Sequence, residues 1–178
     1  MSGRSAEGAA SGGAQQESLL ALYDDALPTV YGYLLSRCGS VGLAEDLTSE
    51  TFLAAVSAVH AGNAPLSVPW VVGIARHKLV DHWRAKGREE AGLSAVASQP
   101  PPDDDPWEVQ LDGLRAQQTL EALSLTHKTV LTLRYLDDLT VPAVAAELGR
   151  TRQATEVLIS RARRAFRREY EVRGGDDG

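Results

Sequence analysis

The sequence is poor in the residues that stabilise secreted or β-rich proteins. Its 178 residues include one cysteine, Cys38, which excludes an internal disulfide or a multi-cysteine zinc site within one chain. Aromatic residues make up only 6%, and β-branched runs that alternate with polar residues are missing, which argues against strands. We expect Cys38 to be a small buried hydrophobe in a protein of a reducing, cytoplasmic compartment.

Long apolar runs are also missing. None approaches the roughly 18 residues that span a bilayer, and residues 1–16 lack the apolar core of a signal peptide, so no membrane insertion is expected. Small, polar and glycine-rich segments at 1–16 and 173–178 are predicted to be disordered tails.

A catalytic constellation is not evident either. The four histidines, His60, His77, His82 and His127, do not combine with carboxylates at metal-ligand spacing. The chain has no glycine-rich phosphate loop and no activated nucleophile. We therefore expect a protein that is not an enzyme and that needs no metal or cofactor.

What is abundant is alanine, leucine and helical periodicity, which predict an all-α fold of two small domains. The segment 98–106, Ser-Gln-Pro-Pro-Pro-Asp-Asp-Asp-Pro, cannot continue a helix. It marks a flexible linker at 87–108 between a domain at 17–86 and another at 109–172. Helices are expected at 17–26, 28–37, 43–59, 68–86, 109–122, 126–136, 141–148 and 151–170.

The last two predicted helices are joined by a short, well-signalled turn. Thr140 can cap a helix that begins with Val141-Pro142, and Gly149 can adopt the left-handed conformation that ends it. Thr151 can then cap the second helix. This spacing is typical of a helix-turn-helix, a unit that places its second helix in the major groove of DNA.

The second helix of this pair has one apolar and one basic face. Its apolar positions, expected to pack on Val144 and Leu148, are Ala154, Thr155, Leu158, Ile159, Ala162, Ala165 and Phe166. Arg152, Gln153 and Glu156 lie where the helix would enter the groove and are candidate base readers, whereas later arginines suit phosphates. The full set of candidate DNA contacts is Thr151, Arg152, Gln153, Glu156, Ser160, Arg161, Arg163, Arg164 and Arg167. The competing interpretation is a solvated basic helix.

Charge separates this end from the rest of the chain. Residues 150–173 hold eight arginines against three glutamates, whereas the whole chain has a net charge of −6. Backbone neutralisation supplies most non-specific affinity for DNA. We therefore expect the protein to need a larger, positively charged carrier to hold DNA at physiological salt.

The predicted helix at 43–59 carries an acidic stripe. Asp46, Ser49, Glu50 and Leu53 are spaced by three and four residues and share one face, whereas Leu47, Phe52, Val56 and Val59 point inward. An acidic stripe with an exposed leucine suits a docking surface. An ordinary solvated face is the simpler interpretation of the residues alone.

The predicted helix at 68–86 combines cations, a glycine and an aromatic residue on one face. Its inner face holds Val71, Val72, Ile74, Ala75, Leu79 and Trp83, and its outer face holds Gly73, Arg76, His77, Val80, Asp81 and Arg84 with Trp70 at the margin. Such a face suits single-stranded nucleic acid. Alternatively, both tryptophans belong to the core and His77 merely faces solvent.

Three segments in this order resemble the extracytoplasmic-function class of bacterial sigma factors. Residues 44–53, Ala-Glu-Asp-Leu-Thr-Ser-Glu-Thr-Phe-Leu, are similar to its polymerase-binding helix, and residues 69–84 are similar to its promoter-melting helix. Residues 123–164 are similar to its C-terminal domain. The joint order of these motifs is more specific than any one of them.

The resemblance implies a promoter-specificity subunit whose partners are core RNA polymerase, promoter DNA and an anti-sigma factor. Asp46, Ser49, Glu50 and Leu53 would bind core polymerase, and the C-terminal helix would read the −35 element. Residues at the −10 element would be Trp70, Arg76, His77, Arg84 and, in the loop 60–67, Asn63. Two residues depart from the family pattern: His77 stands where asparagine is common, and Glu156 where a basic residue is frequent.

Two other functions remain open from the residues. A free-standing helix-turn-helix repressor or activator would bind duplex DNA unaided, as a dimer with spaced half-sites. A helical adaptor would bind only protein through the acidic stripe, although the arginines argue against it.

Overall fold

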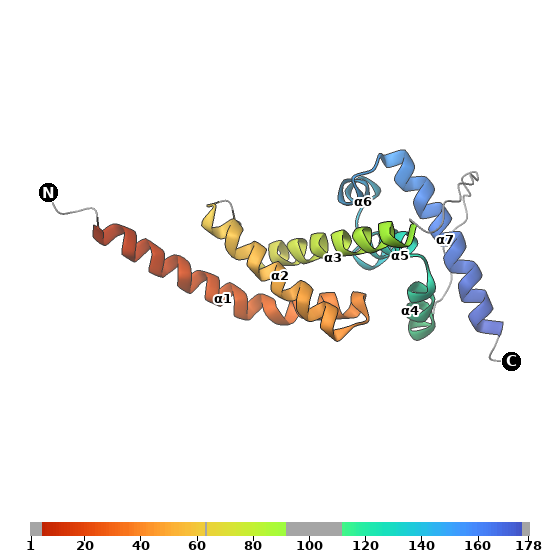
Figure 1. Ribbon diagram of the computed structural model, residues 1–178, viewed down its shortest axis with the longest axis horizontal. Helices are drawn as coiled ribbons and strands as arrows, with labels where there is room; N and C mark the ends of the chain where they lie inside the picture. The colour runs from red at the N-terminus through yellow and green to blue at the C-terminus, as the bar shows by residue number, and fades with distance from the viewer. Residues whose placement is uncertain (1–4, 63, 92–111, 176–178) are drawn as a thin grey trace. The chain divides into compact units, whose positions relative to one another are not determined.

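The computed structural model describes residues 5–62, 64–91 and 112–175, and these ranges contain helices and turns but no strand. The all-helical prediction is confirmed. The elements, which can be followed along the chain in Figure 1, are α1 (Ser5–Cys38), α2 (Val41–His60), α3 (Val68–Ala91), α4 (Gly113–Ala122), α5 (Leu125–Leu131), the π-helical turn η1 (Thr132–Leu136), α6 (Val141–Leu148) and α7 (Arg152–Gly175). They form two compact units, one up to Leu79 and the other from Val80 onward.

Helix α1 differs from the expected pair of helices because Pro28 lies inside it. Leu22, Ala26, Val30 and Leu34, spaced by four residues on either side of the proline, are all buried. Burying this continuous stripe outweighs the backbone hydrogen bond that a proline removes, and Pro28 itself is exposed. The helix also begins at Ser5, within the segment predicted to be a disordered tail, and α7 extends to Gly175 beyond its predicted end.

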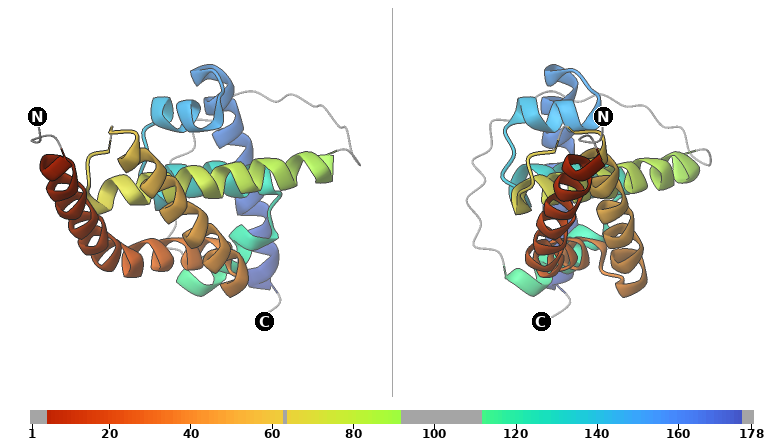
Figure 2. Two further views of the ribbon diagram at one scale, coloured as in Figure 1. Left: turned by 60° about the vertical axis from the view of Figure 1, so that its left-hand side comes forward. Right: turned by 90° about the vertical axis from the view of Figure 1, so that its left-hand side faces the viewer.

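The first unit is built on the pairing of α1 with α2, which Figure 2 shows folding back from the turn after α1. Ser40 caps α2 by accepting a hydrogen bond from the backbone N–H of Leu43 at 3.4 Å. The rings of Tyr23 and Phe52 pack with their centroids 4.6 Å apart. Together these contacts fix which face of α2 is left outside.

The second unit has one apolar core that runs through α5, η1, α6 and α7. Its buried members are Val80, Val130, Leu131, Leu133, Val144, Leu148, Ile159, Ala162 and Phe166. Val80 is 2% exposed, so its prediction as an outer-face residue was wrong. Burial of the valine side chain is favourable because it removes apolar surface from water. Val80 therefore packs into the core, although Arg76 and Arg84, one turn before and one turn after it, are not buried.

The predicted helix at 126–136 is interrupted by a π-helical turn. After α5, the N–H of Asp137 bonds to the carbonyl of Thr132 at 3.0 Å, which is the wider i to i+5 spacing. Asp138 then takes a left-handed conformation with φ 51°, and the N–H of Leu139 returns to the carbonyl of Leu133 at 3.0 Å. Together they end the helix and start the approach to α6.

Candidate nucleic-acid and polymerase interfaces

The helix-turn-helix forms as its sequence predicts. The Thr140 hydroxyl accepts a hydrogen bond from the N–H of Ala143 at 3.4 Å. Gly149 adopts φ 60° and ψ 38°, and the next N–H, of Arg150, bonds back to the carbonyl of Ala145 at 2.9 Å. The Thr151 hydroxyl accepts from the N–H of Ala154 at 3.2 Å, so both predicted caps and the predicted glycine stop are confirmed.

The inner face of α7 follows the expected periodicity with one exception. Thr155, Ile159, Ala162 and Phe166 are buried, whereas Ala154 is exposed and was wrongly assigned to this face. Ala154 lies about 100° from Thr155 around the helix axis, which carries it past the edge of the buried stripe.

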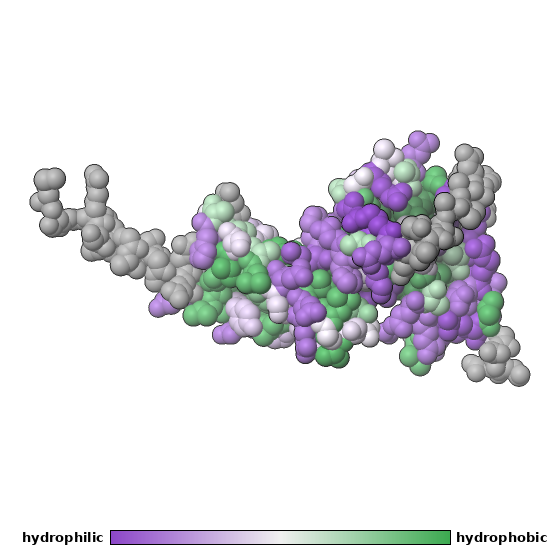
Figure 3. Space-filling view, in the orientation of Figure 1, coloured by the Kyte–Doolittle hydropathy of each residue, from purple (hydrophilic) through white to green (hydrophobic). Residues whose placement is uncertain are grey.

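The first turn and a half of α7 is the most exposed part of its outer face. Arg152, Gln153 and Glu156 are exposed, and Arg152 Nε donates a hydrogen bond to Glu156 Oε1 at 2.9 Å. Farther along, Ser160, Arg163, Arg164 and Arg167 are half-buried, so each still presents part of its side chain. The visible surface over α7 is mostly hydrophilic (Figure 3).

Arg161, like Arg164, is partly enclosed by the protein. It is half-buried, and within the described ranges its Nε is buried without a hydrogen-bond partner. Burial lowers the pKa of the neighbouring His127, and the charges of Arg168 and Arg161 lower it further. The lowered pKa of His127 could not be predicted from sequence patterns, because only the fold brings this residue near arginines more than 30 residues away.

The acidic stripe lies on the outside of α2 as predicted. Asp46, Ser49 and Glu50 are exposed, and the Leu53 side chain is exposed by 69%. Glu50 Oε2 lies 3.5 Å from Lys78 Nζ on α3, an ion pair that the sequence did not suggest. An exposed leucine beside carboxylates is a surface with apolar and charged contacts available to a partner.

The outer face of α3 presents part of the predicted set. His77 and Arg84 are exposed, with Arg84 Nη1 3.9 Å from the carboxylate of Asp81. Trp70 and Arg76 are half-buried, and the Arg76 Nε is buried. Asn63 lies outside the described residues.

The interpretation of Trp83 as a core residue is confirmed. It is 4% exposed, and Lys128 Nζ lies 5.5 Å from the centroid of its ring. Trp70, by contrast, retains exposed area at the margin of the α3 outer face, where it was predicted.

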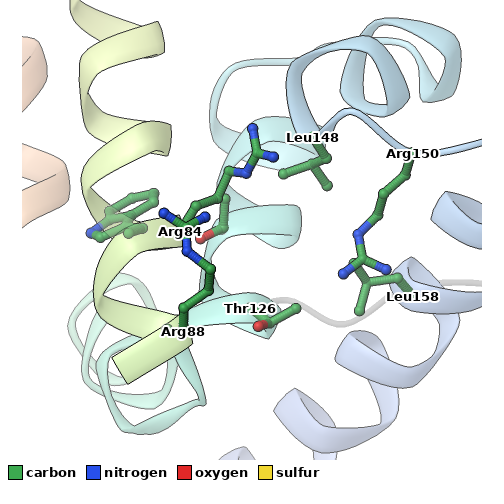
Figure 4. A pocket seen from close by; sticks show the side chains of 9 residues that line it. Arg84, Arg88, Thr126, Leu148, Arg150 and Leu158 are labelled. Carbon is green, nitrogen blue, oxygen red and sulfur yellow. The ribbon is translucent and has the colours of Figure 1, made fainter. Parts of the chain in front are cut away.

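A pocket of about 340 Å³ lies within the second unit (Figure 4). Three of its lining residues are cationic: Arg84 and Arg88 from the end of α3, and Arg150 from the turn between α6 and α7. Leu148 and Leu158 supply apolar wall. The guanidinium groups favour anions over cations at this position.

Neither a membrane span nor a cluster of metal ligands occurs within residues 5–62, 64–91 and 112–175. No helix there is both long and apolar enough to cross a membrane. In the same part of the chain, His, Cys, Asp and Glu side chains do not gather in threes at a spacing that could hold a metal ion.

Comparison with known families gives two matches along this chain. Residues 22–89 match the family described as Sigma-70 region 2, and residues 113–166 match the family described as Sigma-70, region 4. The first match includes all of α3 up to Glu89, whereas the compact units divide that helix after Leu79. The family match thus keeps the outer face of α3, including Arg84, together with α2.

Several curated proteins are similar over most of the chain. The ECF RNA polymerase sigma factor SigL of Mycobacterium tuberculosis is 31% identical over 163 residues, covering 88% of this chain and 92% of SigL. BldN of Streptomyces coelicolor, also an ECF RNA polymerase sigma factor, is 32% identical over 155 residues. That match covers 83% of this chain, and the chain spans 58% of the length of BldN.

A solved structure shares the fold. It is the sigma factor RpoE in complex with the anti-sigma factor NepR from Bartonella quintana, with a TM-score of 0.52 at 20% identity. The match covers 88% of this chain and 96% of RpoE.

Proposed function

Because this chain belongs to the extracytoplasmic-function class of RNA polymerase sigma factors, we propose that it joins core RNA polymerase and directs it to promoters that carry its own −35 and −10 elements. Members of this class are non-enzymatic initiation factors. The observation that carries the proposal is the exposed, arginine-bearing start of α7, held outward by a capped helix-turn-helix.

Core polymerase binds the acidic stripe of α2 in this proposal. Asp46, Ser49, Glu50 and Leu53 are all exposed on one face, and the carboxylates give it a negative potential. Leu53 adds an apolar anchor, with 69% of its side chain available for burial. The Lys78–Glu50 ion pair at 3.5 Å holds one carboxylate in place on the free protein.

The −10 element is assigned to the outer face of α3. His77 and Arg84 are exposed there and Trp70 stands partly exposed beside them, which offers cations to the backbone and an aromatic ring to an unstacked base. Arg76 is half-buried, and it adds a further positive charge to this face. Asn63 is retained as a member of the adjoining loop by resemblance alone.

The −35 element is assigned to α7. Arg152 and Gln153 lie on its exposed first turn, where a recognition helix meets base edges. Thr151, Ser160, Arg161, Arg163, Arg164 and Arg167 are assigned to the DNA backbone. The last four arginines are half-buried, so each keeps part of its side chain exposed, and their shared positive charge supports contact with phosphates rather than with base edges.

An anti-sigma factor is proposed as the regulator, acting in the cytoplasm. The solved structure of RpoE contains such a partner. The domain boundaries that accompany this proposal are 17–86 for the −10 and polymerase functions and 109–172 for the −35 function. The linker is 87–108, although its first residues, 87–91, continue α3 as helix.

Gel shifts with and without core polymerase test the function. Promoter-specific binding only with core supports the proposal. Specific binding by the chain alone identifies a free-standing helix-turn-helix regulator instead, and the chain's net charge of −6 argues against that outcome. Absence of specific binding under both conditions, with co-elution of another protein, identifies an adaptor.

A further inference from the structure

Two residues that were both candidate base readers are bonded to each other at the start of α7. Arg152 Nε and Glu156 Oε1 lie 2.9 Å apart, one helical turn from each other, in a single charge-assisted hydrogen bond. The two side chains are 72% and 49% exposed. The pair therefore stands in solvent at the place where the recognition helix would meet the bases.

Because Arg152 donates to Glu156 through Nε, its other guanidinium nitrogens determine how it can contact a base. A guanidinium recognises guanine by donating two parallel hydrogen bonds to O6 and N7. With Nε already donated to Glu156, the remaining pair is formed by the two terminal nitrogens, Nη1 and Nη2. Glu156 thus leaves the end of the Arg152 fork available while favouring one orientation of its long side chain.

The negative charge of Glu156 also favours its pairing with Arg152 over direct contact with DNA. A lone carboxylate in a DNA groove is repelled by phosphates and loses its hydration, whereas a carboxylate bonded to an arginine is compensated.

We propose that Glu156 is a positioning residue for Arg152, which reads one guanine of the −35 element through its two terminal nitrogens, and that Glu156 does not itself read a base. This rests on the function proposed above. It replaces the expectation that Glu156 reads a base itself with a role exerted through its neighbour.

The experiment uses holoenzyme assembled from the full chain and core polymerase. A −35 duplex is first selected by the wild-type holoenzyme from a randomised library, and affinities are then measured for every single base-pair variant of it. The proteins are wild type, R152A, E156A, E156Q and the double variant R152A/E156A. E169A is the matched control, because Glu169 forms the same kind of i,i+4 pair with Arg173, at 3.0 Å, near the other end of α7.

We expect R152A to lose about 5- to 150-fold of discrimination at one guanine position. E156A should lose discrimination at that same position by a smaller factor, and the double variant should match R152A alone. E156Q, whose amide oxygen still accepts from Nε, should restore most of the preference, and E169A should leave the profile unchanged.

Three results would overturn the proposal. E156A could change preference at a different base pair, which would make Glu156 a reader in its own right. It could alter affinity equally for all duplexes, which would make its effect electrostatic, or its effect could add to that of R152A. If wild-type holoenzyme selects no duplex, the promoter function fails and this inference falls with it.

Discussion

Arg115 on α4 lies over the ring of Tyr170 on α7, with its guanidinium carbon 3.8 Å from the ring centroid. The same guanidinium donates through Nε and Nη2 to the carbonyl of Tyr170, the Nε bond measuring 3.1 Å. The Tyr170 hydroxyl in turn accepts from the N–H of Asp112 at 3.0 Å. Helices α4 and α7 are thus joined through Arg115 and Tyr170, which lie 55 positions apart in the sequence.

Replacing Arg115 by alanine should therefore destabilise the second unit by about 1 to 3 kcal/mol, since it removes two charge-assisted hydrogen bonds and a cation–π contact. The measurement is urea unfolding of the full chain followed by circular dichroism. Q118A, an exposed position on the same helix, should change stability by less than about 0.5 kcal/mol. Equal midpoints for the two variants would show that the contact contributes nothing.

Reversing charge on the acidic stripe should abolish polymerase binding. In D46K/E50K the carboxylates become ammonium groups, and residue 50 would then face Lys78 at the position where Glu50 now lies 3.5 Å from it. Pull-down with core polymerase measures binding, and circular dichroism checks that helicity is kept. E45K reverses a charge on a neighbouring exposed face of α2 and should retain the complex. Retention by D46K/E50K would refute the assignment.

Arginines along the middle of α7 should behave differently from Arg152. R163A is expected to weaken holoenzyme binding by a similar factor for every duplex, because a phosphate contact carries no sequence information. The slope of log affinity against log salt should become shallower by about 0.9. A loss confined to one base pair would reassign Arg163 to base reading.

The second unit should lose stability in mild acid through His127. Its pKa lies below the usual value of 6.5, first because of burial and then because of Arg168 and Arg161. The unfolded chain therefore takes up the proton first as pH falls below 6.5, so the stability that this residue contributes is present above that value and is lost as pH falls through the lower, folded-state pKa. Urea midpoints at about pH 7.5 and about pH 5.5 should differ less in H127Q than in the wild type. An identical pH dependence in both proteins would contradict the assignment.

Features set by neighbouring residues could be predicted from the sequence. Thr140, Gly149 and Thr151 act within three to five residues of themselves, so local chemistry was enough to place the helix-turn-helix. The exposed stripe of α2 followed from periodicity in the same way. These local signals also located the candidate site on α7.

Features that depend on tertiary packing could not be predicted. A proline normally ends or kinks a helix, but the buried stripe of α1 continues on both sides of Pro28. Helical periodicity predicted Val80 on the outer face of α3, but residues of α5 to α7, far along the chain, bury its side chain. The bond between Arg152 and Glu156 was compatible with the sequence, but each side chain was predicted to face DNA on its own.

The four helices of the second unit from α4 onward each start at their own side-chain cap, supplied by Asp112, Ser124, Thr140 and Thr151. Each start point is thus specified within one turn of chain, before any distant contact exists. Short-range contacts lower the average sequence separation that a chain has to close, and such topologies reach their native state within microseconds to milliseconds. Local starts of this kind shorten the conformational search that the second unit makes during folding.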